Sequence, residues 1–90
     1  MCRKYWVGGR VQGVYYRATV AGRARELGVR GYARNTPDGR VEVLACGDDA
    51  AVEALVEWLW IGSSASKVTS VQIEATPCEP LKLPQGFATA

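Results

Sequence analysis

The chain has 90 residues, of which 48% are apolar and 22% are charged, and it contains no histidine. This length and composition predict one folded domain over residues 1–90, and the missing histidine excludes Ser-His-Asp catalysis and zinc sites of the HExxH type. The formal net charge of +2 is unevenly spread, because residues 1–40 hold nine basic residues against two acidic ones. By itself that excess predicts only a solvated basic face.

The spacing of apolar residues predicts four strands and two helices. In chain order these are a strand at 3–8, a helix at 14–27, strands at 30–36 and 40–46, a helix between 48 and 62, and a strand at 67–75. The first strand is expected to end at Gly8-Gly9, and Thr36-Pro37-Asp38-Gly39 is expected to form the turn of a hairpin. Residues 87–89 are a candidate for a short fifth strand at the sheet edge.

This βαββαβ order predicts the α+β class and the ferredoxin-like fold, a split β-α-β sandwich with two helices on one face of an antiparallel sheet. Its first two strands run parallel with the third between them, so their C-terminal ends meet at one edge of the sheet. We therefore expect the loop after the first strand to face Asn35 and Thr36 across a small concavity. Val41, Val43 and Ala45 predict that the third strand has one buried and one more exposed face.

The cysteines and the N-terminal segment bear on the compartment. Cys2, Cys46 and Cys78 form no CxxC pair, which argues against a zinc ribbon or a redox dithiol. Their odd number fits poorly with a fully paired disulfide scaffold, which favours a reducing compartment, and we interpret Cys46 as a small buried hydrophobe. Because no segment is typical of a signal peptide or a membrane span, we predict a cytoplasmic protein without a membrane partner.

The loop that follows the first strand has the features of an anion site. It reads GRVQGVYYR from Gly9 to Arg17 and leads directly into the first predicted helix. Glycine lets backbone N–H groups approach a ligand closely, and a helix N-terminus adds unpaired donors and a partial positive charge. Arg17 lies in the first turn, where its guanidinium can bind the same anion through two parallel hydrogen bonds. The alternative is a tight turn beside a surface arginine.

Two segments resemble a known family. GRVQGVYYR resembles the acylphosphatase signature Gly-x-Val-Gln-Gly-Val-x-Phe/Tyr-Arg. Residues 31–43, GYARNTPDGRVEV, resemble the family's second motif, Gly-Tyr/Trp-Val-x-Asn-x-x-Asp-Gly-x-Val-Glu. One helix fits between the two motifs, and the resemblance covers about residues 5–75.

The resemblance implies an enzyme that hydrolyses acyl phosphates to a carboxylate and inorganic phosphate, with no cofactor and no metal. It implies that Arg17 binds the phosphoryl group, that Asn35 positions the attacking water and that Thr36 is a possible support. The loop amides expected to hold the phosphoryl oxygens belong to Val11, Gln12, Gly13, Val14, Tyr15 and Tyr16. Other readings are that Asn35 is a turn residue, that Thr36 bonds only within the hairpin, and that both tyrosines serve packing.

The expected partners follow from this chemistry. The substrate is a small acyl phosphate, inorganic phosphate or sulfate is the expected site ligand, and we predict a monomer that binds no nucleic acid. An RNA-recognition domain of this fold needs aromatic and basic residues on its central strands, which residues 41–45 lack. The alternative function is a non-catalytic ferredoxin-like ligand-binding or accessory domain, since fold alone does not establish activity.

Overall fold

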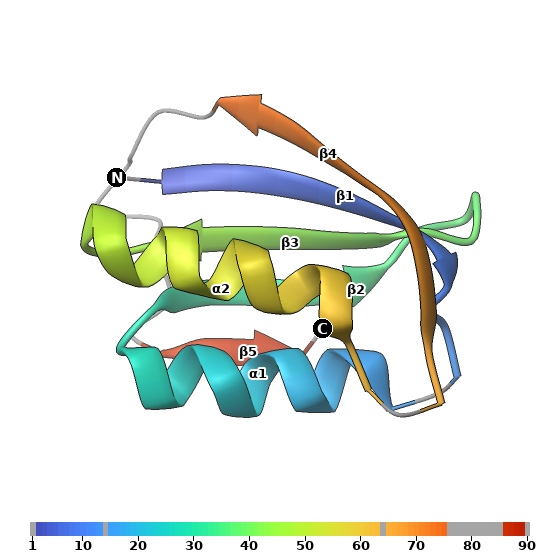
Figure 1. Ribbon diagram of the computed structural model, residues 1–90, viewed down its shortest axis with the longest axis horizontal. Helices are drawn as coiled ribbons and strands as arrows, with labels where there is room; N and C mark the ends of the chain where they lie inside the picture. The colour runs from blue at the N-terminus through green and yellow to red at the C-terminus, as the bar shows by residue number, and fades with distance from the viewer. Residues whose placement is uncertain (1, 14, 64, 76–85, 90) are drawn as a thin grey trace.

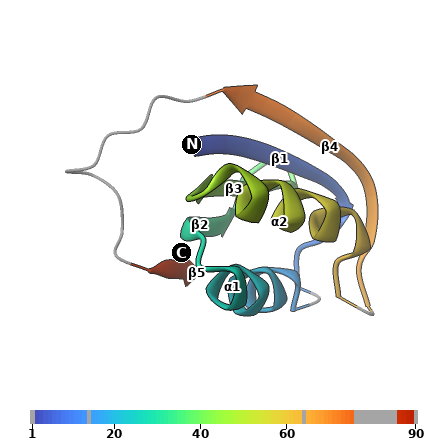
Figure 2. The ribbon, with the colours of Figure 1, turned by 60° about the vertical axis from the view of Figure 1, so that its left-hand side comes forward.

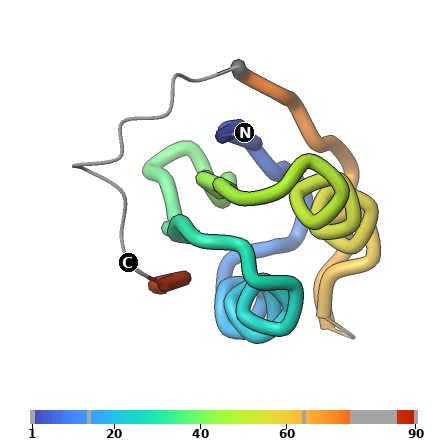
Figure 3. Tube along the Cα trace, turned by 90° about the vertical axis from the view of Figure 1, so that its left-hand side faces the viewer, coloured from blue at the N-terminus to red at the C-terminus, as the bar shows by residue number. Residues whose placement is uncertain are grey.

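A computed structural model describes residues 2–13, 15–63, 65–75 and 86–89. The elements in this part of the chain are β1 (Cys2–Arg10), α1 (Tyr16–Leu27), β2 (Arg30–Asn35), β3 (Val41–Cys46), α2 (Asp49–Ile61), β4 (Lys67–Ala75) and β5 (Phe87–Thr89). The strand order is β4-β1-β3-β2-β5, and both helices lie on the same face of the sheet (Figures 1 and 3). The ferredoxin-like α+β fold is thereby confirmed. Among the described helices, none has the length and apolar character needed to cross a membrane.

The core lies between the helices and the inner face of the sheet. Alternate residues of the strands point into it, which is the two-residue period of a β-strand. The helices contribute apolar residues at intervals of three and four, so each has one stripe against the sheet. Large buried side chains in this layer include Tyr5, Val7, Tyr16, Val20, Val41, Val43, Val52, Leu55, Leu59 and Phe87.

Strand β1 is longer than its glycines predict. It continues through Gly8 and Gly9 to Arg10, with a bulge between the two glycines where the pairing with β4 shifts. Gly9 has a φ of 116°, and a Cβ added there would collide with the backbone carbonyl of Lys67. The two glycines therefore allow a bulged strand to continue rather than ending it.

The sheet is mixed, whereas an all-antiparallel sheet was expected. The fifth strand forms, but β5 pairs with β2 in parallel, and β4 and β5 occupy opposite edges (Figure 2). Phe87 anchors β5 in the core, and the Arg25 side chain donates a 2.8 Å hydrogen bond to the Phe87 carbonyl oxygen. This contact ties the start of β5 to the last turn of α1.

The outer face of β3 is less exposed than the alternating pattern predicts. Glu42 is only 1% exposed, because side chains from the two neighbouring strands cover its carboxylate. Arg34 donates to it through Nε and Nη2 at 3.1 and 2.8 Å, the Tyr32 hydroxyl donates to it, and Lys4 lies 3.7 Å away. Burial alone would raise the pKa of Glu42, but these donors outweigh it and hold the pKa below its usual value.

Two cysteines are paired, which corrects the interpretation of Cys46 as merely a small hydrophobe. Cys2 and Cys46 form a disulfide across β1 and β3, where the two residues are register partners. Both are buried. Cys78 lies outside the described residues. The sequence spacing of 44 positions carries no sign of this pair, because the pairing depends on strand register.

Candidate active site

The β1–α1 loop and the β2–β3 hairpin lie at the same end of the sheet, as the topology predicted (Figure 1). A side chain joins them directly. The Gln12 amide nitrogen donates to the carbonyl oxygens of Thr36 at 2.8 Å and Arg40 at 2.9 Å. The sequence suggested only a backbone role for Gln12. Its side chain holds the loop against the hairpin that carries Asn35, a role that has no signal in the local sequence.

Gln12→Leu is expected to lower the free energy of unfolding by about 1–2 kcal/mol, because it removes both bonds across the two segments. Urea denaturation followed by circular dichroism measures this difference. Gln72→Leu is the matched control, because Gln72 is exposed on β4 and only accepts a long 3.4 Å bond from Arg40. Its expected change is below about 0.5 kcal/mol. Equal losses in the two variants would contradict the role of Gln12.

The loop reaches helix α1 through two residues in the left-handed region. Gly13 has a φ of 71° and Tyr15, at the N-cap, a φ of 61°. Val11 is buried and anchors the loop, while Val14 lies outside the described residues. Left-handed residues in a turn aim successive backbone N–H groups into a concavity that suits an anion. Tyr15 makes no side-chain capping bond to the N-terminus of α1, and the first turn of the helix carries no acidic residue. The partial positive charge of the helix N-terminus is therefore not neutralised by these side chains and suits a negative ligand.

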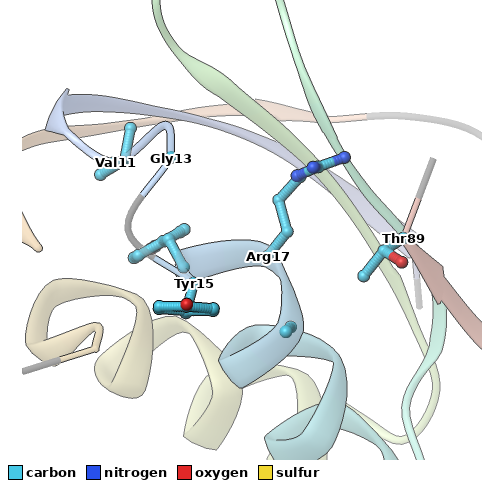
Figure 4. Close-up of a pocket in the computed structure, with 7 residues that line it drawn as sticks. Val11, Gly13, Tyr15, Arg17 and Thr89 are labelled. Carbon is cyan, nitrogen blue, oxygen red and sulfur yellow. The ribbon is translucent and has the colours of Figure 1, made fainter. Parts of the chain in front are cut away.

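A pocket of about 340 Å³ opens at this helix N-terminus. It is lined by Val11, Gly13, Tyr15, Tyr16, Arg17, Ala18 and Thr89. Figure 4 shows the Arg17 side chain extending from the first turn of α1, between Gly13 on one side and Thr89 on the other. The pocket thus brings a guanidinium, a glycine-containing loop and a helix N-terminus together. All three stabilise negative charge.

The two tyrosines of the motif differ. Tyr16 is buried, as expected, and its hydroxyl donates a 2.8 Å hydrogen bond to the carbonyl oxygen of Leu59 on α2. Burial raises the pKa of Tyr16 well above its usual value. Tyr15 does not pack in the core: it is 83% exposed, so the packing role suggested for it is wrong. Its left-handed backbone turns the side chain outward, away from the stripe that begins at Tyr16.

Asn35 and Thr36 lie on the hairpin and do not line this pocket in the described part of the chain. Asn35 is the exposed last residue of β2. The Thr36 hydroxyl bonds within the hairpin, to the Asp38 carboxylate and at 3.0 Å to the carbonyl oxygen of Arg40. Hydrogen bonds from the Arg40 and Thr36 side chains lower the pKa of Asp38 to about 2. Thr36 therefore stabilises the turn that follows Asn35.

Sequence reasoning missed Thr89, because its place beside Arg17 depends on β5 pairing with β2. The only local signal was the short apolar segment that begins at Phe87. Within the described ranges, no three cysteine, aspartate or glutamate side chains come together as they would around a metal ion.

Comparisons with known proteins agree with the two motifs. A family model described as Acylphosphatase matches residues 3–89. An acylphosphatase of Chromohalobacter salexigens is 56% identical over 79 residues, which cover 88% of each chain. A crystal structure of acylphosphatase from Bacillus subtilis aligns with a TM-score of 0.91 and 35% identity, over 100% of this chain and 99% of that one. An acylphosphatase structure from Coxiella burnetii gives a TM-score of 0.90 and 35% identity, over 99% and 90% of the two chains. The chain therefore belongs to the acylphosphatase family.

Proposed function

We propose that this acylphosphatase hydrolyses acyl phosphates by direct attack of water on a phosphoryl group held between the β1–α1 loop and Arg17. The observation that carries the proposal is the convergence of Gly13, Tyr15 and Arg17 on one pocket at the N-terminus of α1. Backbone N–H groups of residues 11–16 would hold phosphoryl oxygens, and the planar guanidinium would bind two of them. The charge that builds on the phosphoryl group is then stabilised from two sides.

Hydrolysis of an acyl phosphate needs little more than a phosphoryl group and a water molecule held in position. An acyl phosphate has a good leaving group, because the bond from phosphorus to the acyl oxygen breaks to release a carboxylate. The water oxygen forms the new bond to phosphorus, and the water proton passes to a phosphoryl oxygen of the substrate. The chain has no histidine, and Cys2 and Cys46 are held in a disulfide, so a covalent phosphoenzyme on these groups is not favoured. Positioning and charge neutralisation supply the rate enhancement.

We assign the orientation of the water to Asn35. Its amide group both donates and accepts hydrogen bonds, as needed to hold a water molecule in one orientation. The bonds from Gln12 to the carbonyl oxygens of Thr36 and Arg40 support this role, because they hold the segment after Asn35 against the loop. Thr36 supports it by keeping the turn closed.

The proposal is tested by following the hydrolysis of benzoyl phosphate by the wild-type chain in the presence of a chelator. We expect turnover without added metal and competitive inhibition by inorganic phosphate, because both anions use the same N–H groups and Arg17. A folded protein that does not turn over benzoyl phosphate would instead support the non-catalytic ligand-binding alternative.

Asn35→Ala is expected to lower kcat for benzoyl phosphate by about 10²-fold, because the attacking water loses its orientation. The KM should change by less than about threefold, since Asn35 is not assigned to the phosphoryl group. Steady-state kinetics at pH 7 measure both constants. Asn35→Asp, which keeps the size of the side chain but adds a negative charge, should also be impaired. Full kcat in Asn35→Ala would make Asn35 only a turn residue.

A further inference from the structure

We infer that the ring of Tyr15 is a platform for the acyl group of the substrate, so that the site prefers acyl phosphates with an aromatic or bulky apolar acyl group. This inference rests on the proposed function and specifies its substrate class. Tyr15 lines the pocket with Gly13 and Arg17, yet it is 83% exposed. An aromatic ring at the opening of a phosphoryl pocket is placed for contact with the part of the substrate that is not phosphate.

The backbone of Tyr15 supports a role beyond packing. Its φ of 61° is left-handed, and no other non-glycine residue in the described ranges has a positive φ. This conformation is unfavourable for a bulky side chain, and the exposed ring buries too little surface to offset it. Glycine or asparagine would remove the strain. Strain that the local fold does not require is typical of functional sites.

The geometry of a bound acyl phosphate also supports contact between its acyl group and Tyr15. When the phosphoryl group lies against the loop N–H groups, the acyl group must extend outward, toward the opening of the pocket. The volume of about 340 Å³ is in the range of small-molecule sites and leaves space beyond a phosphoryl group. The neighbouring Tyr16 also lines the pocket, as do the apolar side chains of Val11 and Ala18. The pocket lining therefore combines apolar and aromatic side chains with the Arg17 guanidinium.

The test compares kcat/KM for benzoyl phosphate with kcat/KM for acetyl phosphate in four proteins. These are the wild type, Tyr15→Phe, Tyr15→Asn and Trp60→Ala. Both substrates carry the same phosphoryl group, so any change in the cradle affects them alike and cancels in the ratio. Asparagine tolerates the left-handed backbone, which keeps the loop intact while removing the ring. Trp60 is the matched control, because it is 52% exposed and, among the described residues, is not part of the pocket lining.

We expect the benzoyl-to-acetyl ratio to fall about three- to tenfold in Tyr15→Asn, which is the usual strength of an aromatic pair. Tyr15→Phe and Trp60→Ala should keep the wild-type ratio. An unchanged ratio in Tyr15→Asn, or an equal fall in Trp60→Ala, would overturn the inference while leaving the proposed function intact. If the wild type hydrolyses neither substrate, the proposed function fails and the inference fails with it.

Discussion

Replacing Arg17 with alanine is expected to lower kcat/KM for benzoyl phosphate by about 10³- to 10⁴-fold, the largest loss of activity that we predict. In the proposed site Arg17 is the cationic side chain aimed at the phosphoryl group, and alanine removes two charge-assisted hydrogen bonds. Because the bound charge grows in the transition state, most of the loss should be in kcat. Initial rates over a range of substrate concentrations, on protein shown to be folded by circular dichroism, give both constants.

Two further variants separate charge from geometry at this position. Arg17→Lys keeps the positive charge but lacks the planar fork, so it should recover only part of the lost rate. Arg23→Ala removes an exposed arginine from the same helix, where it pairs with Glu26 at 2.9 Å, and it should change kcat/KM by less than about twofold. If Arg17→Ala kept more than about a tenth of the wild-type rate, charge neutralisation by this residue would not be the main source of catalysis.

Removing the disulfide is expected to have the largest effect on stability. The double variant Cys2→Ala/Cys46→Ala should unfold with a free energy about 4 kcal/mol lower than that of the oxidised wild type, because the bridge spans 44 positions and restricts the unfolded chain. Urea denaturation with and without dithiothreitol measures the difference. For a small domain with a total stability of about 5–15 kcal/mol, such a loss is severe.

The controls for this prediction use the remaining cysteine and the active site. Cys78→Ala should respond to dithiothreitol like the wild type, whereas the double variant should not respond at all. The double variant, where it is folded, should retain activity. The disulfide joins β3 to the end of β1 that lies opposite the β1–α1 loop (Figure 1). A denaturation midpoint that does not change with reductant would contradict a stabilising bridge between Cys2 and Cys46.

The uneven charge of the chain does not produce one basic face. Several arginines of the first half form ion pairs, as Arg34 does with Glu42 and Arg40 with Asp38. The interleaved strand order places residues of both halves side by side. Counting charges along the sequence therefore overestimates the basic surface, and it does not distinguish Arg17 from the other arginines. What distinguishes Arg17 from the other arginines is its position in the first helical turn after a glycine-containing loop.

Most of the fold could be predicted from local patterns. The apolar stripes of both helices, the turn at Pro37-Asp38-Gly39 and the strand at 67–75 match the structure, because each depends on neighbours a few residues apart. The errors concern non-local pairing. The bulge at Gly8-Gly9 depends on β4, and the burial of Glu42 depends on side chains of β1 and β2. Both features depend on contacts between strands, which the apolar pattern within one strand does not show.

The candidate site also has features that the local sequence predicts and features that depend on non-local pairing. The order of its residues along the loop, with Gly13 before a helix and Arg17 in the first turn, is a local property, so the amino-acid sequence sufficed to predict an anion site and the family chemistry. Strand register and packing determined two further features, which are the hydrogen bonds from the Gln12 side chain to the hairpin and the place of Thr89 beside Arg17. These features require segments far apart in the chain to meet. Their geometry depends on how the whole sheet pairs, which no short stretch of sequence specifies.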